Sequence, residues 1–294
     1  MNRKLLIFGV AISLYGTVLT SCGNSGLTVS NDVLVIGMEA NYQPFNWTTY
    51  TSSEYTLPIY GTNEYADGYD VAIAKYLSHE TGKDVYIKRI VWDSLIPSLQ
   101  QDEVNLVLAG MTDTPERRKS IDFTDPYLTS DLAFLIRTED MPEGYGTKEN
   151  PASYEQLLEL FDGQTLVCQA NVVGDGFIDT YFVNNDQGKT IRHANPQSTY
   201  PSAANEVKGG VSFAMPAELP VIETMTNLGG LSVLYCDYKS FLSEEDLNGL
   251  SVSIGVKKGN AELADEINAA LSKLSDEERN KMMGDAASRS AENA

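Results

Sequence analysis

Histidine and basic residues are scarce in this sequence, and each scarcity argues against a class of function. The two histidines, His79 and His193, stand in no nucleophile or metal-ligand pattern, so we expect neither triad nor zinc chemistry and no cofactor. Only 21 basic residues accompany 41 acidic ones, and the net charge of −20 argues against nucleic acid as a partner. No glycine-rich loop of the phosphate-binding type precedes a helix. The sequence therefore gives no indication of triad, zinc, nucleic-acid or phosphate-loop chemistry.

Long apolar runs are also lacking, except for one at the N-terminus. The run from Leu5 to Leu19 follows two basic residues and is too short for a permanent span, so residues 1–21 are predicted to be a secretory signal. Its end resembles the bacterial lipobox, which implies cleavage before Cys22 and lipidation of this cysteine. With the lipid on Cys22, residues 22–31 would form a polar tether to the extracytoplasmic face of the cell membrane. The alternative is an ordinary signal peptide with an incidental cysteine.

The rest of the chain, roughly 270 residues, exceeds the usual size of one domain and predicts two lobes. Strand and helix patterns alternate along it, which predicts an α/β fold. The first lobe is expected to hold residues 32–129 and 251–294, and the second residues 130–250. Strands at 131–137 and 251–256 are expected to run side by side between the lobes and form a hinge.

Two features of the chain are open to more than one interpretation. Residues 47–68 are predicted to form a long polar loop that either packs over a site or only decorates the surface. Cys168 and Cys236 either form a disulfide in an oxidising compartment or are two buried thiols.

The most informative stretch is the turn from Gly110 to Arg117, which follows a buried strand. Thr114 is a good N-cap and Pro115 suits the first helical position, so a helix is predicted to begin there. Arg117 would project from the first turn, where its guanidinium and free backbone N–H groups can hold a carboxylate. The Thr112 hydroxyl would take further oxygen lone pairs. The alternative is that Arg117 only pairs on the surface with a nearby aspartate, Asp113 or Asp122.

Five segments together resemble the bacterial extracellular solute-binding proteins of family 3, the polar amino acid-binding proteins of ABC transporters. The resemblance covers nearly all of the mature chain. The segments are residues 38–47 (MEANYQPFNW), 65–74 (YADGYDVAIA), 92–97 (WDSLIP), 110–127 (GMTDTPERRKSIDFTDPY) and 255–263 (GVKKGNAEL). The resemblance implies a two-lobed periplasmic-binding-protein-like fold of type II, with the ligand in the cleft between the lobes.

The resemblance also implies roles for residues of the first lobe. Arg117 and Thr112, helped by the backbone at Gly110, would bind the α-carboxylate of an amino acid, and Tyr42 would form an aromatic wall. Glu39 would sit at the carboxyl end of the first strand, where it suits a ligand side chain that is cationic or carries an N–H donor. Trp47 would stack on such a side chain. The alternatives are a capped turn for Glu39 and core packing for Trp47.

The second lobe departs from the family pattern. The family usually has a glycine followed by a hydroxyl residue where this chain has Gln169-Ala170-Asn171-Val172, so only backbone amides at Asn171 and Val172 would face the carboxylate. A gap-free alignment places Glu218 where the family has its acidic partner for the α-ammonium. Another register places Ala214 there instead, and Glu218 would then be a surface residue beside a turn.

The resemblance implies that the protein is the substrate-binding component of an ABC importer. Its partners would be a free amino acid, the membrane permease and, through the Cys22 lipid, the membrane itself; we expect a monomer and no enzymatic activity. Two alternatives come from other classes of function. One is a dehydratase-type enzyme on the same fold, and the other is a surface receptor that senses amino acids.

Overall fold

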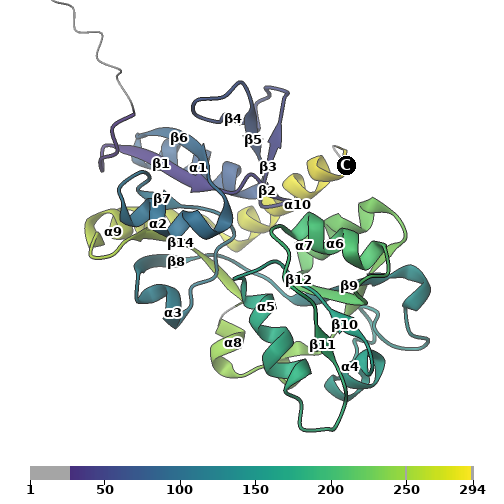
Figure 1. Cartoon of the computed structure of the whole chain (residues 1–294). Coiled ribbons are helices and arrows are strands. Elements are labelled where there is room, and N and C mark those ends of the chain that lie inside the picture. The colour runs from purple at the N-terminus through teal and green to yellow at the C-terminus, as the bar shows by residue number, and fades with distance from the viewer. Residues whose placement is uncertain (1–26, 249, 293–294) are drawn as a thin grey trace, which may run out of the picture.

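The computed structural model describes residues 27–248 and 250–292, which fold into two lobes (Figure 1). The predicted signal, the lipidation site at Cys22 and the first part of the tether lie outside the described residues. Within the described part of the chain, no helix is both long enough and apolar enough to cross a membrane.

The first lobe is built on a five-stranded sheet whose apolar strands are buried, as the hydrophobic runs predict. The strand β1 is parallel to β6 and β7, whereas β14 is antiparallel to β7 and β8. Helices α1, α2 and α9 pack against this sheet. The sheet order is β6 (Asp84–Arg89), β1 (Val33–Met38), β7 (Leu106–Val107), β14 (Ser251–Lys257) and β8 (Ile121–Thr129), and the helices are α1 (Tyr69–Thr81), α2 (Leu95–Gln100) and α9 (Ala261–Leu271).

The second lobe repeats this arrangement with a second five-stranded sheet. The strand β10 is parallel to β11 and β12, and β9 is antiparallel to β12 and β13. Helices α5, α6 and α7 pack on its strands. The sheet order is β11 (Arg192–His193), β10 (Thr165–Leu166), β12 (Ala214–Glu218), β9 (Leu132–Arg137) and β13 (Leu231–Tyr235), and the helices are α4 (Tyr154–Phe161), α5 (Val173–Phe177), α6 (Tyr200–Lys208), α7 (Leu219–Met225) and α8 (Glu244–Asn248).

The predicted pairing of the strands at 131–137 and 251–256 is wrong. The first of them, β9, lies in the second sheet between β12 and β13, while β14 pairs with β8 in the first sheet. The chain nevertheless crosses between the lobes at two adjacent places. There the Ser130 amide donates to the Leu250 carbonyl at 3.3 Å, and the hydroxyls of Thr129 and Ser251 lie 2.8 Å apart.

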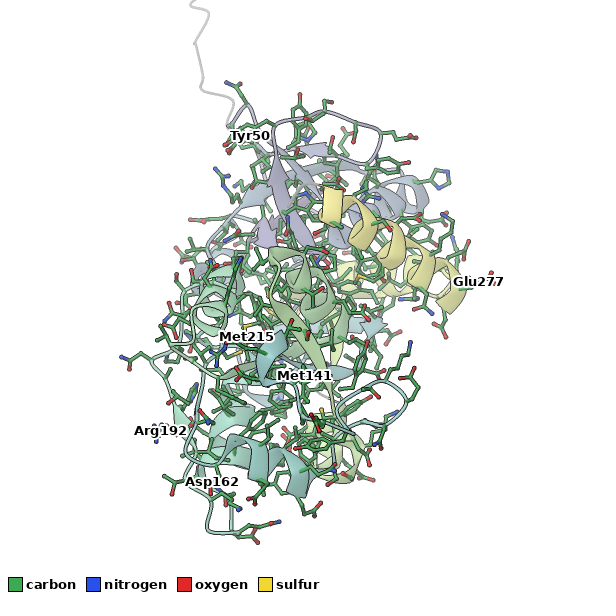
Figure 2. The ribbon with its side chains drawn as sticks, turned by 90° about the vertical axis from the view of Figure 1, so that its right-hand side faces the viewer. Tyr50, Met141, Asp162, Arg192, Met215 and Glu277 are labelled. Atoms are coloured by element: carbon green, nitrogen blue, oxygen red, sulfur yellow. The ribbon has the colours of Figure 1, made fainter. Side chains whose placement is uncertain are left out.

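The segment 47–68 is not the loop that the sequence predicts. It contributes three strands to a small antiparallel sheet of the order β2 (Asn41–Tyr42), β3 (Asn46–Thr49), β5 (Tyr65–Asp67) and β4 (Leu57–Pro58). These strands are two to four residues long and pair mainly with one another, so no extended hydrophobic alternation marks them. Figure 2 places Tyr50, just after β3, at one end of the molecule and Asp162, just after α4, toward the other.

The C-terminal helix α10 (Asp276–Glu292) lies beside α7 of the second lobe (Figure 1). Cys168 and Cys236 are both free and buried, which decides between the two interpretations of these cysteines. The remaining elements are short: α3 (Pro115–Arg118), the 3-10 turns η1 (Trp92–Ser94), η2 (Thr138–Asp140), η4 (Thr226–Leu228) and η5 (Tyr238–Ser240), and the π-helix η3 (Ile178–Val183).

Candidate functional site

A small pocket lies between the lobes, and both lobes supply its walls. The first lobe contributes residues that follow the carboxyl ends of β1 and β7, the edge at which parallel strands present ligand sites. The second lobe contributes the turn after β10, the start of α6 and the end of β12. The lining residues are Glu39, Tyr42, Trp92, Gly110, Thr112 and Arg117 from the first lobe, and Gln169, Val172, Val173, Tyr200 and Glu218 from the second.

Arg117 is held in this pocket by contacts that fix its guanidinium. Thr114 caps α3 as predicted, because its hydroxyl accepts a hydrogen bond from the Arg117 amide at 3.2 Å. One guanidinium nitrogen donates to the Thr112 carbonyl at 2.7 Å and the other to the Asn171 carbonyl at 3.0 Å. The guanidinium also lies 5.3 Å from the ring centre of Trp92. Burial lowers the pKa of Arg117 to about 10, so it is a cation at neutral pH.

The alternative interpretation of Arg117 as a surface partner of an aspartate is wrong. Asp113 accepts from the neighbouring Arg118, whose Nε donates at 2.6 Å. Asp122 accepts from Lys258 at 2.6 Å and from the Gly259 amide at 2.7 Å.

Gly110 is required at its turn, but its amide is not a donor for a ligand. Its φ of 59° lies in the left-handed region, and a Cβ there would lie 2.7 Å from the Cε1 atom of Tyr42. The Gly110 N–H donates to the Tyr127 hydroxyl at 2.9 Å. The predicted help of this backbone in carboxylate binding therefore lacks its donor.

Glu218 faces Arg117 from the second lobe, at the end of β12. The Tyr42 hydroxyl donates a hydrogen bond to its carboxylate across the cleft. Burial raises the pKa of Glu218, although the Tyr42 hydrogen bond and the charge of Arg117 oppose this shift. Ala214, the alternative candidate, is fully buried in the second sheet. The geometry therefore favours the gap-free alignment.

Tyr42, predicted to form an aromatic wall, lines the pocket and is joined there by a second tyrosine. The Tyr42 ring stacks on that of Tyr200 at a centroid distance of 4.7 Å and an interplanar angle of 16°. On the other side it stacks on Phe45 at 5.1 Å. The stack crosses the cleft, because Tyr200 belongs to the second lobe.

Glu39 forms a second carboxylate in the pocket and is 9% exposed. The side-chain amide of Gln169 donates to it from the other lobe at 3.4 Å. Burial, together with the charge of Asp93, raises the pKa of Glu39 to about 7, while the Gln169 hydrogen bond lowers it.

Trp47 does not line this pocket. It is 3% exposed and pairs in the small sheet with Asn41 and Asp67. Together with Glu39 it lines a neighbouring surface hollow, and its indole N–H has no partner among the described residues. Core packing, the alternative that the sequence left open, describes Trp47 better than ligand stacking.

Asn171 touches the first lobe instead of lining the pocket. Its carbonyl accepts from Arg117 and, at 3.3 Å, from the Trp92 indole. Its side chain donates to Asp93 at 2.9 Å, and its own amide points to Asp175 at 3.4 Å. The predicted amide of Asn171 is thus engaged within its own lobe, whereas Val172 lines the pocket as predicted.

Four pocket residues were not predicted as ligand contacts: Trp92, Gln169, Val173 and Tyr200. Trp92 belongs to a segment that carries the family resemblance, but the sequence does not indicate that its side chain lines the pocket. Gln169 and Val173 lie in or next to the turn where the chain departs from the family pattern, so the resemblance predicts no role for them. Tyr200 begins α6 after a Thr199 N-cap and carries no signal in the sequence, because its place depends on how the lobes meet.

Comparison with known proteins identifies the family. Residues 34–284 match the bacterial extracellular solute-binding proteins, family 3. The chain belongs to this family. The predicted function of a solute-binding protein, and the predicted resemblance, are thereby confirmed, and the family places the protein outside the cytoplasm.

Individual relatives are binding proteins. An arginine-binding extracellular protein of Bacillus subtilis is 35% identical over 141 residues, a match that spans 47% of this chain and 49% of the relative. A probable histidine-binding protein of Campylobacter jejuni is 26% identical over 235 residues, spanning 73% of this chain and 85% of the relative.

Solved structures confirm the two-lobed fold of type II. An amino acid ABC transporter substrate-binding protein of Streptococcus pneumoniae, bound to L-arginine, superposes with a TM-score of 0.68 at 19% identity. The superposition covers 88% of this chain and 96% of that structure. An ancestral amino acid-binding protein, described as a precursor of cyclohexadienyl dehydratase, superposes with a TM-score of 0.65 at 24% identity.

Proposed function

We propose that this protein captures an amino acid between its lobes and delivers it to the permease of an ABC importer. The observation that carries the proposal is the arrangement of charge in the pocket. The cation of Arg117 stands on the first lobe, and the carboxylate of Glu218 faces it from the second. A zwitterion placed between them finds an opposite charge for each of its own, which a partly buried ligand requires.

The α-carboxylate would bind Arg117, the only guanidinium among the pocket residues, through parallel N–H donors. Thr112 and the backbone at Val172 line the same space. The α-ammonium would bind Glu218. Tyr42 and Tyr200, which stack on each other across the cleft, would together form one wall of the ligand site.

A cationic or amide side chain would suit the remaining part of the pocket. Glu39 supplies a carboxylate there and Gln169 an amide from the opposite lobe. The arginine-binding relative in Bacillus subtilis and the arginine-bound structure from Streptococcus pneumoniae support this choice. We propose L-arginine as the first ligand to test.

The lobes would hinge where the chain crosses at Ser130 and Leu250, with residues 32–129 and 251–294 on one side and 130–250 on the other. Closure is favoured only by the difference in ligand affinity between the closed and open forms. Lipidation at Cys22 would keep the protein near the permease, and the ligand would leave unchanged, since we propose binding without turnover.

Substitution of Arg117 tests the carboxylate assignment. We expect R117A to weaken L-arginine binding at least tenfold, about 1.4 kcal/mol, because hydrogen bonds to charged groups contribute roughly 1.5–3 kcal/mol each. The matched control is R118A, which removes the neighbouring arginine that pairs with Asp113 outside the pocket. Isothermal titration calorimetry that finds equal affinity for R117A and R118A would overturn the assignment.

A further inference from the structure

We propose that Asp70 is a positioning residue that fixes two backbone segments of the first lobe beside the pocket, one at Gly110 and one at Ala40. It does so through two chains of hydrogen bonds, which we call arms. The inference rests on the proposed ligand site. Asp70 is fully buried near the start of α1 and does not line the pocket. Its two carboxylate oxygens accept from two different side chains, and each of these side chains reaches a loop that does line the pocket.

The first arm runs through Tyr127 to Gly110. The Tyr127 hydroxyl donates to Oδ1 of Asp70 at 2.7 Å and accepts from the Gly110 amide at 2.9 Å. The hydroxyl has one proton, so donation to Asp70 leaves its lone pair for Gly110. Tyr69 fixes the same tyrosine by stacking on its ring at 5.7 Å and donating to its carbonyl at 2.8 Å. This arm therefore holds the turn that begins at Gly110 and leads to Thr112.

The second arm runs through Asn46 to Ala40. The side-chain amide of Asn46 donates to Oδ2 of Asp70 at 2.6 Å, and its oxygen accepts from the Ala40 amide at 2.7 Å. Ala40 has a φ of 54°, a left-handed conformation that is uncommon outside glycine. It stands next to Glu39 and two residues before Tyr42, so this arm fixes the bend that aims both side chains.

The direction of the hydrogen bonds makes the carboxylate specific. Both neighbours donate to Asp70, and an asparagine at position 70 offers only one acceptor. Its amide would face the amide of Asn46, and rotation of Asn46 would turn a donor toward the Ala40 amide. Exchanging the two side chains in the double variant D70N/N46D restores every bond. The amide introduced at position 70 accepts from Tyr127 and donates to the carboxylate introduced at position 46, which in turn accepts from Ala40.

Site-resolved amide hydrogen exchange by NMR tests the arms without any ligand. In the wild type we expect the amides of Gly110 and Ala40 to be protected. D70N should increase exchange at Ala40 by at least tenfold, and D70N/N46D should return it to within threefold of the wild type. Y127F should increase exchange at Gly110 and leave Ala40 unchanged.

Binding of L-arginine provides the second readout. We expect D70N and N46D each to weaken binding at least fivefold, and the double variant to bind within threefold of the wild type. The matched control is D67N, which removes a nearby buried carboxylate that pairs with Arg289 at 2.8 Å and does not line the pocket. D67N should lower the unfolding midpoint in urea without changing affinity.

Two results would overturn the inference. One is unchanged exchange at Ala40 in D70N, and the other is a double variant that binds no better than either single variant. The variant R117A distinguishes an error in the role of Asp70 from an error in the proposed ligand site. If R117A weakens binding and D70N does not, only the positioning role of Asp70 is wrong; if R117A has no effect, the ligand site itself is wrong.

Discussion

Glu39 and Glu218 differ from ordinary surface carboxylates because burial raises the pKa of each. The raised values mean that both groups bind protons more readily than in water and gain from a cationic partner. Arg117 has the opposite shift, since burial lowers its pKa. Each of these side chains would therefore be better solvated by a charged ligand group than by the protein alone, which is the physical basis of the proposed zwitterion binding.

The affinity for L-arginine should depend on pH through Glu39. With a pKa of about 7, the ionised fraction of Glu39 increases about tenfold between pH 6 and pH 8, and a guanidinium prefers the ionised form. Asp93 and Gln169 face this carboxyl, and neither the ligand guanidinium nor its ammonium titrates in that range. We expect the association constant, measured by calorimetry, to increase about fivefold to tenfold over this interval.

The variant E39Q controls for the other groups, Glu218 among them. It should bind L-arginine more weakly at pH 8 and lose most of the pH dependence. An equal increase in affinity in the wild type and in E39Q would show that another group is responsible.

At the scale of elements, the helix start in the turn from Gly110 to Arg117 was predictable because the interactions that determine it are local. The Thr114 cap and Pro115 at the first helical position act within a few residues, and the structure has both. The small sheet of residues 41–67 was not predicted, because its strands are too short for a hydrophobic alternation to mark them. The strand β13 was not predicted, because it depends on its partner β9, which is distant in sequence. The same reason explains why β14 was assigned the wrong neighbour: the strand itself was visible, but its pairing with β8 was not.

The candidate ligand residues also differ in whether local sequence could predict them. Arg117, Thr112, Glu39 and Tyr42 lie beside strand ends or caps that the sequence marks. Tyr200 and the contacts of Asn171 depend on how two lobes meet, and no local pattern encodes that.

Gly68 joins the small sheet to α1, and its substitution should be costly. It has a φ of 131°, and a Cβ there would lie 2.2 Å from the Phe45 carbonyl oxygen and 2.8 Å from the Asn46 Cα. Because both are backbone atoms, no side-chain rotation relieves the clash. We expect G68A to lower the free energy of unfolding by at least about 3 kcal/mol in urea titration.

The matched control for this substitution is G61A. Gly61 has a φ of 77° but no atom within 4 Å of its would-be Cβ, so only backbone strain of about 1–2 kcal/mol is expected. Similar losses for G68A and G61A would mean that close packing at Gly68 is not what requires glycine.

For the whole molecule, the lobes meet through direct polar contacts around the pocket. Asn171 reaches Arg117, Trp92 and Asp93, and Gln169 reaches Glu39. The helix α10 adds a contact with α7 away from the pocket. These contacts join the two lobes beside the pocket and should slow the escape of a bound ligand.

Replacing Asn171 with glycine tests this contribution. N171G removes the bond to Asp93 but permits the left-handed φ of 61° and keeps the carbonyl that Arg117 and Trp92 use. We expect the dissociation rate of L-arginine, measured by stopped-flow fluorescence, to increase about threefold to tenfold, with a smaller change in the association rate. An unchanged dissociation rate would show that the bond between Asn171 and Asp93 does not hold the lobes together.

The central claim is that the protein binds an amino acid by its charged α-groups. It is tested most directly by thermal unfolding of the wild type with each of the twenty L-amino acids and with agmatine, which is arginine without its carboxylate. We predict that L-arginine raises the midpoint by about 5 °C or more, since ligand at 100 times its Kd stabilises by ~2.7 kcal/mol, and that agmatine has little effect. No shift with any of the amino acids, or equal shifts with L-arginine and agmatine, would contradict the claim.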